Sequence, residues 1–299
     1  MRHFRPVPNV SKGETMKVTL SEEKVFNKKQ IAIYATIIVI CIISIIIAFY
    51  VQFYARIDIF GVEPESQIGK KTEEQIEELH AGFDQIFTNN IEIEEGESQD
   101  NKKIEADKPL VYTKTEKKEN KLNNYDIDVH IPYINIDNKI VEKYNKEIEA
   151  FESKINSVLG SKNKNSIYTV EYVSNVQNGI LSLMIRSNLK EGNNIQRVIL
   201  KTYNYDLRNN KEISLEEVLR IENIEKTALQ QKIKNEISAE QKKVEDLKAL
   251  GYNIYSRDVE SIKYNIENSK VFYLTDNALY IMYAYGNETL TNEMDLIVI

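Results

Sequence analysis

Three side chains that can ligate a metal ion alternate along one short stretch of the sequence: Asp126, Asp128 and His130. Alternate residues of a β-strand point to the same face, so a strand here would bring the two carboxylates and the imidazole together. These groups suit zinc or another transition metal. The sequence supplies no fourth ligand at a recognised spacing, however, and a solvated strand face explains the same pattern. We therefore predict no metal site and keep these residues as the one candidate cluster.

Residues for nucleophilic or phosphate chemistry are scarce. The chain has three histidines and a single cysteine, Cys41. It has no G-x-S-x-G elbow for a serine nucleophile, no Walker loop and no G-x-G-x-x-G turn. The sequence thus predicts no catalytic residues, no cofactor and a protein that is not an enzyme.

Tyrosine is abundant, with eighteen copies against no tryptophan. Exposed tyrosines are common in protein interfaces and stack on sugar rings, but tyrosine is also an ordinary strand residue. For any single tyrosine the structural role is the simpler interpretation, whereas the group suggests a binding role. Nine of them crowd the C-terminal half: Tyr203, Tyr205, Tyr252, Tyr255, Tyr264, Tyr273, Tyr280, Tyr283 and Tyr285.

The strongest signal for an element is an uncharged apolar run from Ile31 to Tyr54. As a helix it would be roughly 36 Å long, enough to cross a hydrocarbon core of about 30 Å. It is too long for a signal peptide and lacks a small-residue cleavage site. In a bacterial lipoprotein signal the lipidated cysteine ends the apolar core, whereas ten mostly apolar residues follow Cys41 here. We expect an uncleaved transmembrane helix at 31–55, with the lipid bilayer as its partner.

Charge on either side of this run gives its direction. The segment 1–30 is basic, and the segment 56–109 is strongly acidic. By the positive-inside rule the N-terminus is cytoplasmic and the rest of the chain is extracytoplasmic. The formal net charge of −7 argues against nucleic acid as a partner and is compatible with a cationic one.

We predict that the acidic segment 56–109 is a stalk that contains a short amphipathic helix at about 72–88. Thr72 and Gln75 have the form of a capping box. The apolar stripe behind it leaves three options open: packing on the main domain, pairing with a second copy as a coiled coil, or lying on the membrane. From Glu92 to Lys108 the low apolar content predicts a flexible linker.

Residues 110–299 have the patterns of one extracytoplasmic α+β domain. A helix capped by Asp137 or Asn138 ends at Gly160, and Asn178-Gly179 predicts a tight hairpin. Ser214 and Glu217 form a second capping box. Expected strands are 110–112, 125–132, 167–176, 180–189, 195–207, 271–274, 278–285 and 294–299, and later helices are a short one from 215 and a longer one at about 224–250. Since helices and strands come in blocks, we predict an antiparallel sheet meander with packed helices and no βαβ unit.

Four phrases of this domain, in this order, resemble a known extracytoplasmic module. They are Tyr125 to Ile134 followed by an Asn-rich cap and the Tyr144-Asn145 helix, then Tyr203 to Leu207, Lys211 to Leu219 and Val271 to Ile281. The region is similar to the tandem DUF4163/DUF3298 module of RsiV-type anti-sigma factors and PdaC-type peptidoglycan deacetylases. That resemblance implies a single-pass bacterial envelope protein with an outer sensing or binding domain. It also implies lysozyme, a basic protein, or a cell-wall glycan as the ligand.

The sequence therefore predicts a membrane-anchored extracytoplasmic ligand-binding or sensory module that is not an enzyme. One alternative is an RsiV-like anti-sigma factor that responds to lysozyme or envelope stress. The segment 1–30 would then bind a sigma factor, although it is short for burying an apolar face on a partner. A second alternative is an accessory or degenerate cell-wall enzyme component.

Overall fold

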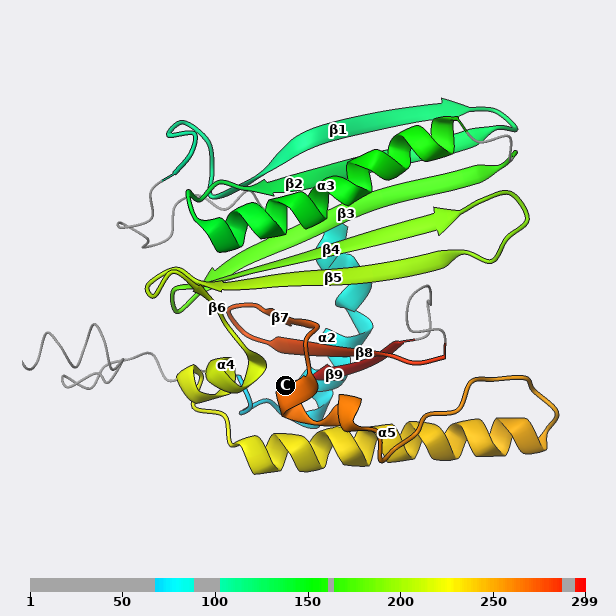
Figure 1. The fold of residues 1–299 in the computed structure, drawn as a ribbon. Helices are drawn as coiled ribbons and strands as arrows, with labels where there is room; N and C mark the ends of the chain where they lie inside the picture. The colour runs from blue at the N-terminus through cyan, green and yellow to red at the C-terminus, as the bar shows by residue number, and fades with distance from the viewer. Residues whose placement is uncertain (1–67, 89–102, 161–163, 287–293) are drawn as a thin grey trace, which may run out of the picture. The chain divides into compact units, whose positions relative to one another are not determined.

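The computed structural model describes residues 68–88, 103–160, 164–286 and 294–299 of the chain (Figure 1). Glu63–Ile299 forms one compact unit. Within the described residues, no helix combines the length and the apolar character that crossing a membrane requires. The predicted span at 31–55 lies outside those residues, as do the segment 1–30 and the first part of the predicted stalk.

The larger sheet has six strands in the order β1-β2-β3-β4-β5-β6. Its strands are β1 (Val111–Lys121), β2 (Tyr125–Ile134), β3 (Ser166–Gln177), β4 (Ile180–Lys190), β5 (Arg197–Asp206) and the two-residue β6 (Lys211–Glu212). The strand at 110–112 was predicted too short. β1 continues to Lys121 through a run rich in lysine and glutamate. These residues fit a strand here because β1 is an edge strand that exposes most of its side chains.

The prediction of a purely antiparallel sheet is wrong. β2 and β3 pair in parallel, with Tyr125 opposite Ser166 and Val129 opposite Val170. The helix α3 (Lys139–Leu159) joins them, which makes β2-α3-β3 the βαβ unit that we did not expect. Two parallel neighbours require such a crossover, and here the helix crosses one face of the sheet. The class α+β holds, with a mixed sheet.

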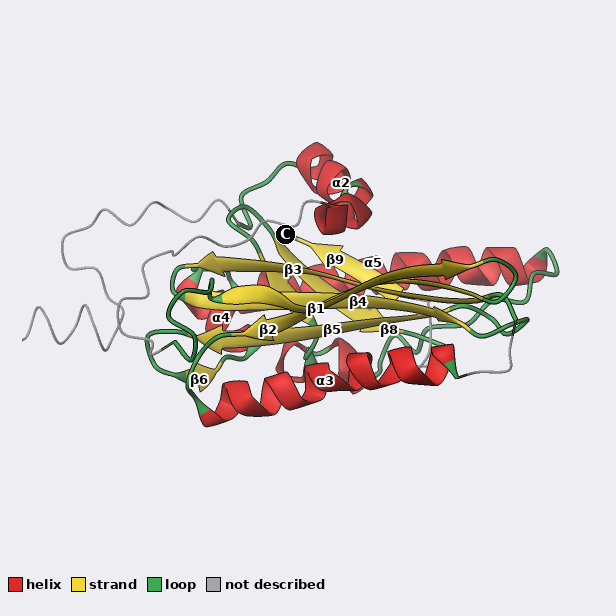
Figure 2. Ribbon diagram, turned by 90° about the horizontal axis from the view of Figure 1, so that it is seen from above, coloured by secondary structure: helices red, strands yellow, loops and turns green. Residues whose placement is uncertain are grey.

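Helix α3 begins and ends where its sequence predicts. The Asn138 side chain accepts a hydrogen bond from the Ile140 N–H, and Gly160 closes the last turn. Its apolar stripe lies on the sheet and forms the largest core of the molecule with side chains from β1 to β5. Figure 2 shows α3 along one face of the strands, so the opposite face of the sheet is open to other elements.

The tight turn at Asn178-Gly179 is confirmed. Both residues have positive φ, 50° and 72°, which matches the twist of the flanking strands. β3 and β4 pair in continuous register from Ile167 opposite Lys190 to Gln177 opposite Ile180. The C-terminal half of the chain packs against this long hairpin.

The C-terminal half forms a second, three-stranded antiparallel sheet of β7 (Phe272–Leu274), β8 (Leu279–Ala284) and β9 (Met294–Val298). One face of it contributes to a core with helices α4 (Leu215–Ile221) and α5 (Lys226–Ala249). The Ser214–Glu217 capping box at the start of α4 is confirmed. Two short 3₁₀ helices, at Ile262–Tyr264 and Ile266–Asn268, line the same core.

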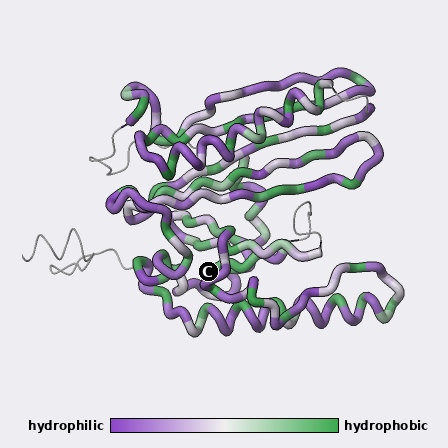
Figure 3. Tube along the Cα trace, viewed as in Figure 1, coloured by the Kyte–Doolittle hydropathy of each residue, from purple (hydrophilic) through white to green (hydrophobic). Residues whose placement is uncertain are grey.

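The expected amphipathic helix at 72–88 consists of α2 (Glu73–Ala81), with the Thr72–Gln75 capping box present, and the 3₁₀ helix η1 (Phe83–Thr88). Of its three expected partners the structure shows the main domain. Ile76, Leu79, Phe83 and Phe87 pack in a third core against side chains of β3, β4 and the second sheet. Helix α5 carries many hydrophilic residues along its length (Figure 3).

The predicted flexible linker is wrong for its last residues. The buried Asn135 side chain accepts hydrogen bonds from the N–H groups of Ile104 and Glu105, at 3.1 and 2.9 Å. It also donates to the carbonyl oxygens of Glu105, Lys108 and Pro109. One amide thus fixes the chain that leads into β1, despite the low apolar content of that chain.

Candidate functional site

The residues of the candidate metal cluster lie on a strand, as predicted. Asp126, Asp128 and His130 share the face of β2 opposite the buried Ile127 and Val129. Asp128 accepts from Lys118 Nζ at 2.5 Å, and His130 Nε2 lies 3.4 Å from its other oxygen. Among the residues that the structure describes, no three acidic, histidine or cysteine side chains are placed to hold a metal ion.

Most of the C-terminal tyrosines build the cores. Seven of the nine are at most 9% exposed, while Tyr252 and Tyr255 are exposed. Tyr283 illustrates how a buried ring satisfies its hydroxyl, which lies 2.6 Å from the Ser269 hydroxyl. Burial raises the pKa of Tyr283 to about 12. The tyrosine group is thus explained by packing, and only individual exposed or half-exposed rings remain for binding.

The polar residues of the motif phrases also have structural roles. Asn145 of α3 exchanges two hydrogen bonds of 2.9 Å with the backbone N–H and C=O of Ile134. Asn204 of β5 donates to the Phe272 carbonyl oxygen at 3.0 Å. Asp206 accepts from the N–H groups of Arg208 and Asn209, at 3.0 Å each, and so closes the turn after β5. These side chains position elements and are not available for a ligand.

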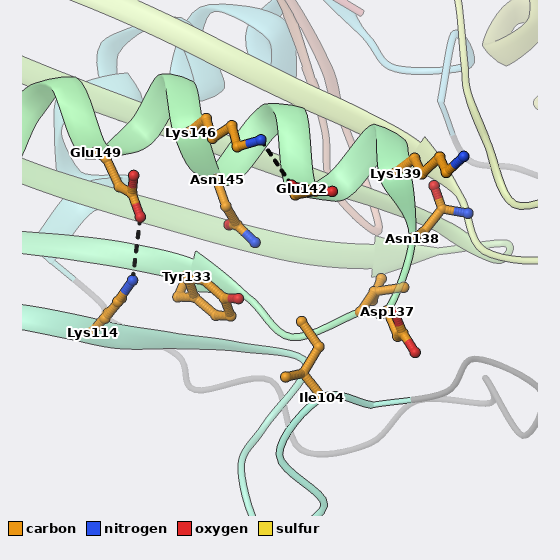
Figure 4. A pocket seen from close by; sticks show the side chains of 11 residues that line it. Ile104, Lys114, Tyr133, Asp137, Asn138, Lys139, Glu142, Asn145, Lys146 and Glu149 are labelled. Carbon is orange, nitrogen blue, oxygen red and sulfur yellow. Dashed lines mark hydrogen bonds and ion pairs between the residues drawn. The ribbon is translucent and has the colours of Figure 1, made fainter.

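A groove of about 500 Å³ lies where the N-terminal half of α3 crosses the ends of β1 and β2 (Figure 4). We call it the α3 groove. Four parts of the chain line it: Ile104 before β1, Lys114 and Tyr133 on the strands, Ile136–Lys139 before and at the start of α3, and Glu142, Asn145, Lys146 and Glu149 on the helix. The β2-α3 connection brings them together, because α3 turns back over the strand that precedes it.

Tyr133 supplies the aromatic side chain of the α3 groove. It is half-buried, and its ring centroid lies 5.6 Å from that of Tyr112 on β1. The Lys114 ammonium lies 4.7 Å from the Tyr133 ring centroid and 3.5 Å from the Glu149 carboxylate. Since Lys114 is 43% exposed, its contacts are weak and a ligand can displace it from the ring.

Charged residues of both signs line the groove. Lys146 donates to Glu142 at 2.7 Å, and this hydrogen bond lowers the pKa of Glu142. Asp137 and Lys139 add one further charge of each sign. The α3 groove therefore offers donors and acceptors in equal measure around an aromatic ring, which suits a ligand rich in hydroxyl and amide groups.

Sequence reasoning did not single out the residues of the α3 groove. Several have an ordinary local role, since Glu142 and Lys146 form an i,i+4 pair on α3 and Tyr133 follows a strand pattern. Only the return of α3 over β1 and β2 brings them to one place. No local sequence signal marks that juxtaposition.

Comparisons with known proteins find similarity at the level of solved structures alone. No family model matches the chain, and no curated protein matches it. A DUF3298 family member from Bacteroides fragilis is similar at 16% identity and a TM-score of 0.33, covering 58% of this chain and 80% of that one. A DUF3298 family protein from Pseudomonas aeruginosa PAO1 is similar at 13% identity and a TM-score of 0.26, covering 33% of this chain and 50% of that one. Both of these solved structures are described as DUF3298 family proteins, and neither description mentions DUF4163.

Proposed function

We propose that this protein is a membrane-anchored extracytoplasmic binding module of a bacterial envelope, and that the α3 groove binds a wall glycan. The observation that carries the proposal is the half-buried ring of Tyr133, with Lys114 over it, in a groove that lysines and carboxylates also line. A tyrosine ring can stack on a sugar, and the surrounding groups can bond its hydroxyl and amide substituents. The uncharged run at 31–54 and the basic segment before it support the anchored, outward-facing arrangement.

A non-enzymatic role fits the same residues. A hydrolase acting on glycans needs two carboxyl groups with different tasks, one of them held protonated by its surroundings. In the α3 groove, Glu142 and Glu149 each pair with a lysine, and the pairing of Glu142 favours its ionised form. Carboxylates paired in this way can recognise a ligand, and the ionised form that Glu142 favours is not a proton donor.

Calorimetry on the full chain in detergent, titrated with soluble peptidoglycan fragments, tests this function. We expect saturable binding that Tyr133→Ala weakens by about tenfold or more, which corresponds to about 1.4 kcal/mol. Tyr252→Ala is the matched control, since Tyr252 is exposed and does not line the groove. Equal affinities of the two variants would exclude the α3 groove, and binding of lysozyme with no binding of glycan would assign the module to a basic protein ligand.

A further inference from the structure

A second cavity, of about 510 Å³, lies beside the turn of the long β3–β4 hairpin. Its wall combines the Asn178 turn, the connection between α4 and α5, the first two turns of α5, and residues near both ends of the described unit. We call it the Glu222 cavity. The residues that matter for its chemistry are Lys70, Asn178, Glu222, Glu225 and Lys232, with Ile68, Ile224, Leu229 and Ile299 among its apolar lining.

Glu222 is the unusual member of this wall. It is 2% exposed, and its Oε1 accepts a hydrogen bond from Asn178 Nδ2 at 2.9 Å. Its Oε2 is buried and has no hydrogen-bond partner. A buried carboxylate oxygen without a donor costs more free energy than a neutral polar atom, so it is a strong acceptor for any donor that reaches it.

The backbone holds Glu222 in this place. It ends α4, where its N–H donates to the Val218 carbonyl oxygen at 2.9 Å. Asn223 follows with a positive φ of 54°, and Asn178 opposite has a φ of 50°. Two adjacent left-handed positions thus fix the carboxylate and its amide partner between two rigid turns.

The other acidic residue of the wall is already occupied. Both oxygens of Glu225 cap helix α5, accepting from the N–H of Thr227 at 2.9 Å and from the N–H of Ala228. Glu222 is therefore the carboxylate that remains for a ligand. A metal ion would need further ligands, and the described residues hold no group of three that could supply them.

Two lysines bring positive charge to the same cavity. Lys232 pairs with Glu236, outside the cavity wall, at 3.3 Å, and its side chain is 30% exposed. Lys70 lines the cavity next to Gly69. Since an exposed i,i+4 pair contributes little, a ligand carboxylate can recruit Lys232 at small cost.

We propose that the Glu222 cavity binds a small zwitterion, an amino acid or short peptide whose ammonium bonds Glu222 and whose carboxylate bonds Lys70 and Lys232. The apolar lining then accommodates a small side chain, and the volume suits a ligand of this size. This site is separate from the α3 groove and shares no lining residue with it. The proposal therefore stands or falls independently of glycan binding.

Calorimetry on the full chain with alanyl-alanine as the probe tests the proposal. N-acetyl-alanyl-alanine lacks the ammonium, and alanyl-alanine amide lacks the carboxylate. We expect the free dipeptide to bind at least about tenfold more tightly than either derivative. Glu222→Gln should weaken dipeptide binding to the same degree, while the control Glu116→Gln, on the exposed edge strand β1 and outside the cavity wall, should not.

Thermal unfolding of the variants separates a loss of binding from a loss of folding. Glu222→Gln retains the size of the side chain and the bond to Asn178, so thermal unfolding should show an intact fold. If that variant fails to fold, Lys232→Met serves in its place, with loss of the preference for a free carboxylate as the expected result. Absence of saturable dipeptide binding to the unmodified chain, or equal affinity of the three probes, would overturn the proposal.

Discussion

Buried polar side chains complete the hydrogen bonding of β7, which has a strand neighbour on one side only. On its other side, the N–H of Leu274 donates to the Ser182 hydroxyl at 3.1 Å, and the N–H of Phe272 donates to the Thr202 hydroxyl at 3.3 Å. Asn204 donates to the Phe272 carbonyl oxygen and accepts from Ser182. These side chains of β4 and β5 take the place of a missing strand.

Removing Asn204 should therefore cost more stability than removing a comparable asparagine on the open face of the sheet. We expect Asn204→Ala to lower the free energy of unfolding by about 2 kcal/mol, because the buried Phe272 carbonyl oxygen and the Ser182 hydroxyl both lose this partner. Asn188→Ala is the control, since Asn188 is only part-buried and donates to Thr169. Urea unfolding measures both, and equal losses would contradict this role of Asn204.

Glu225 makes the stability of the folded protein depend on pH in the acidic range. Hydrogen bonds from the N–H groups of Ala228 and Thr227 lower its pKa in the folded protein. A lowered pKa means that its stabilising effect is present above the ordinary glutamate pKa of about 4.3 and is lost as the pH falls through the folded value. We expect stability to fall less steeply below pH of about 4 in Glu225→Gln than in the unmodified chain.

Urea midpoints measured across this pH range provide the check. Glu116→Gln, on the exposed edge strand β1, is the matched control and should keep the slope of the unmodified chain. A Glu225→Gln slope identical to that of the unmodified chain would show that the carboxylate charge does not support the α5 cap.

At the scale of elements, local patterns predicted the main helices and the tight turn. The α3 stripe, the Asn178-Gly179 turn and both capping boxes depend on residues within one or two turns of each other, so the sequence reveals them directly. The pairing of β2 with β3 depends on where α3 returns the chain, which periodicity does not encode. For a similar reason the sequence did not decide which surface α2 packs on, since an apolar stripe fits any apolar surface.

The contact of η1 with the large sheet depends on Arg186 of β4. Its guanidinium lies 4.1 Å from the Phe87 ring centroid, pairs with Glu171 at 2.8 Å and also bonds Asp84. Arg186→Ala should loosen α2 and η1 while the sheet persists, with amide hydrogen exchange at residues 73–88 about tenfold faster or more.

Exchange at Val170 in β3 should remain unchanged in the same experiment, since it lies in the core on the α3 side. Arg197→Ala is the matched control, because Arg197 pairs with Glu191 away from η1. If both variants exchange alike at 73–88, the contacts of Arg186 do not hold the segment.

At the scale of the whole molecule, the sites were harder to predict than the fold. Tyr133 and Glu149 reach one groove only through the return of α3 over β1 and β2, and Glu222 meets Asn178 across more than forty residues of sequence. No spacing rule connects them. The cluster that spacing did indicate, Asp126 to His130, has the geometry of an exposed strand face.

The orientation of the chain is a prediction from its charges and can be tested directly. Alkaline phosphatase fused after Asn120 should be active, since the positive-inside rule places that residue outside the cytoplasm. A fluorescent reporter that matures only in the cytoplasm should stay dark at the same position. Deleting residues 31–55 should abolish phosphatase activity, and activity that survives this deletion would refute the anchor.

The way the chain enters its fold has a mechanical consequence. Ile68, the first described residue, is 3% exposed in the core beside α4 and α5, and α2 and η1 follow in a different core. A pull on the chain before Ile68 loads these contacts one after another, whereas the β3–β4 ladder shares a load over eleven residue pairs. The N-terminal segment should therefore detach at low force, before the large sheet unfolds.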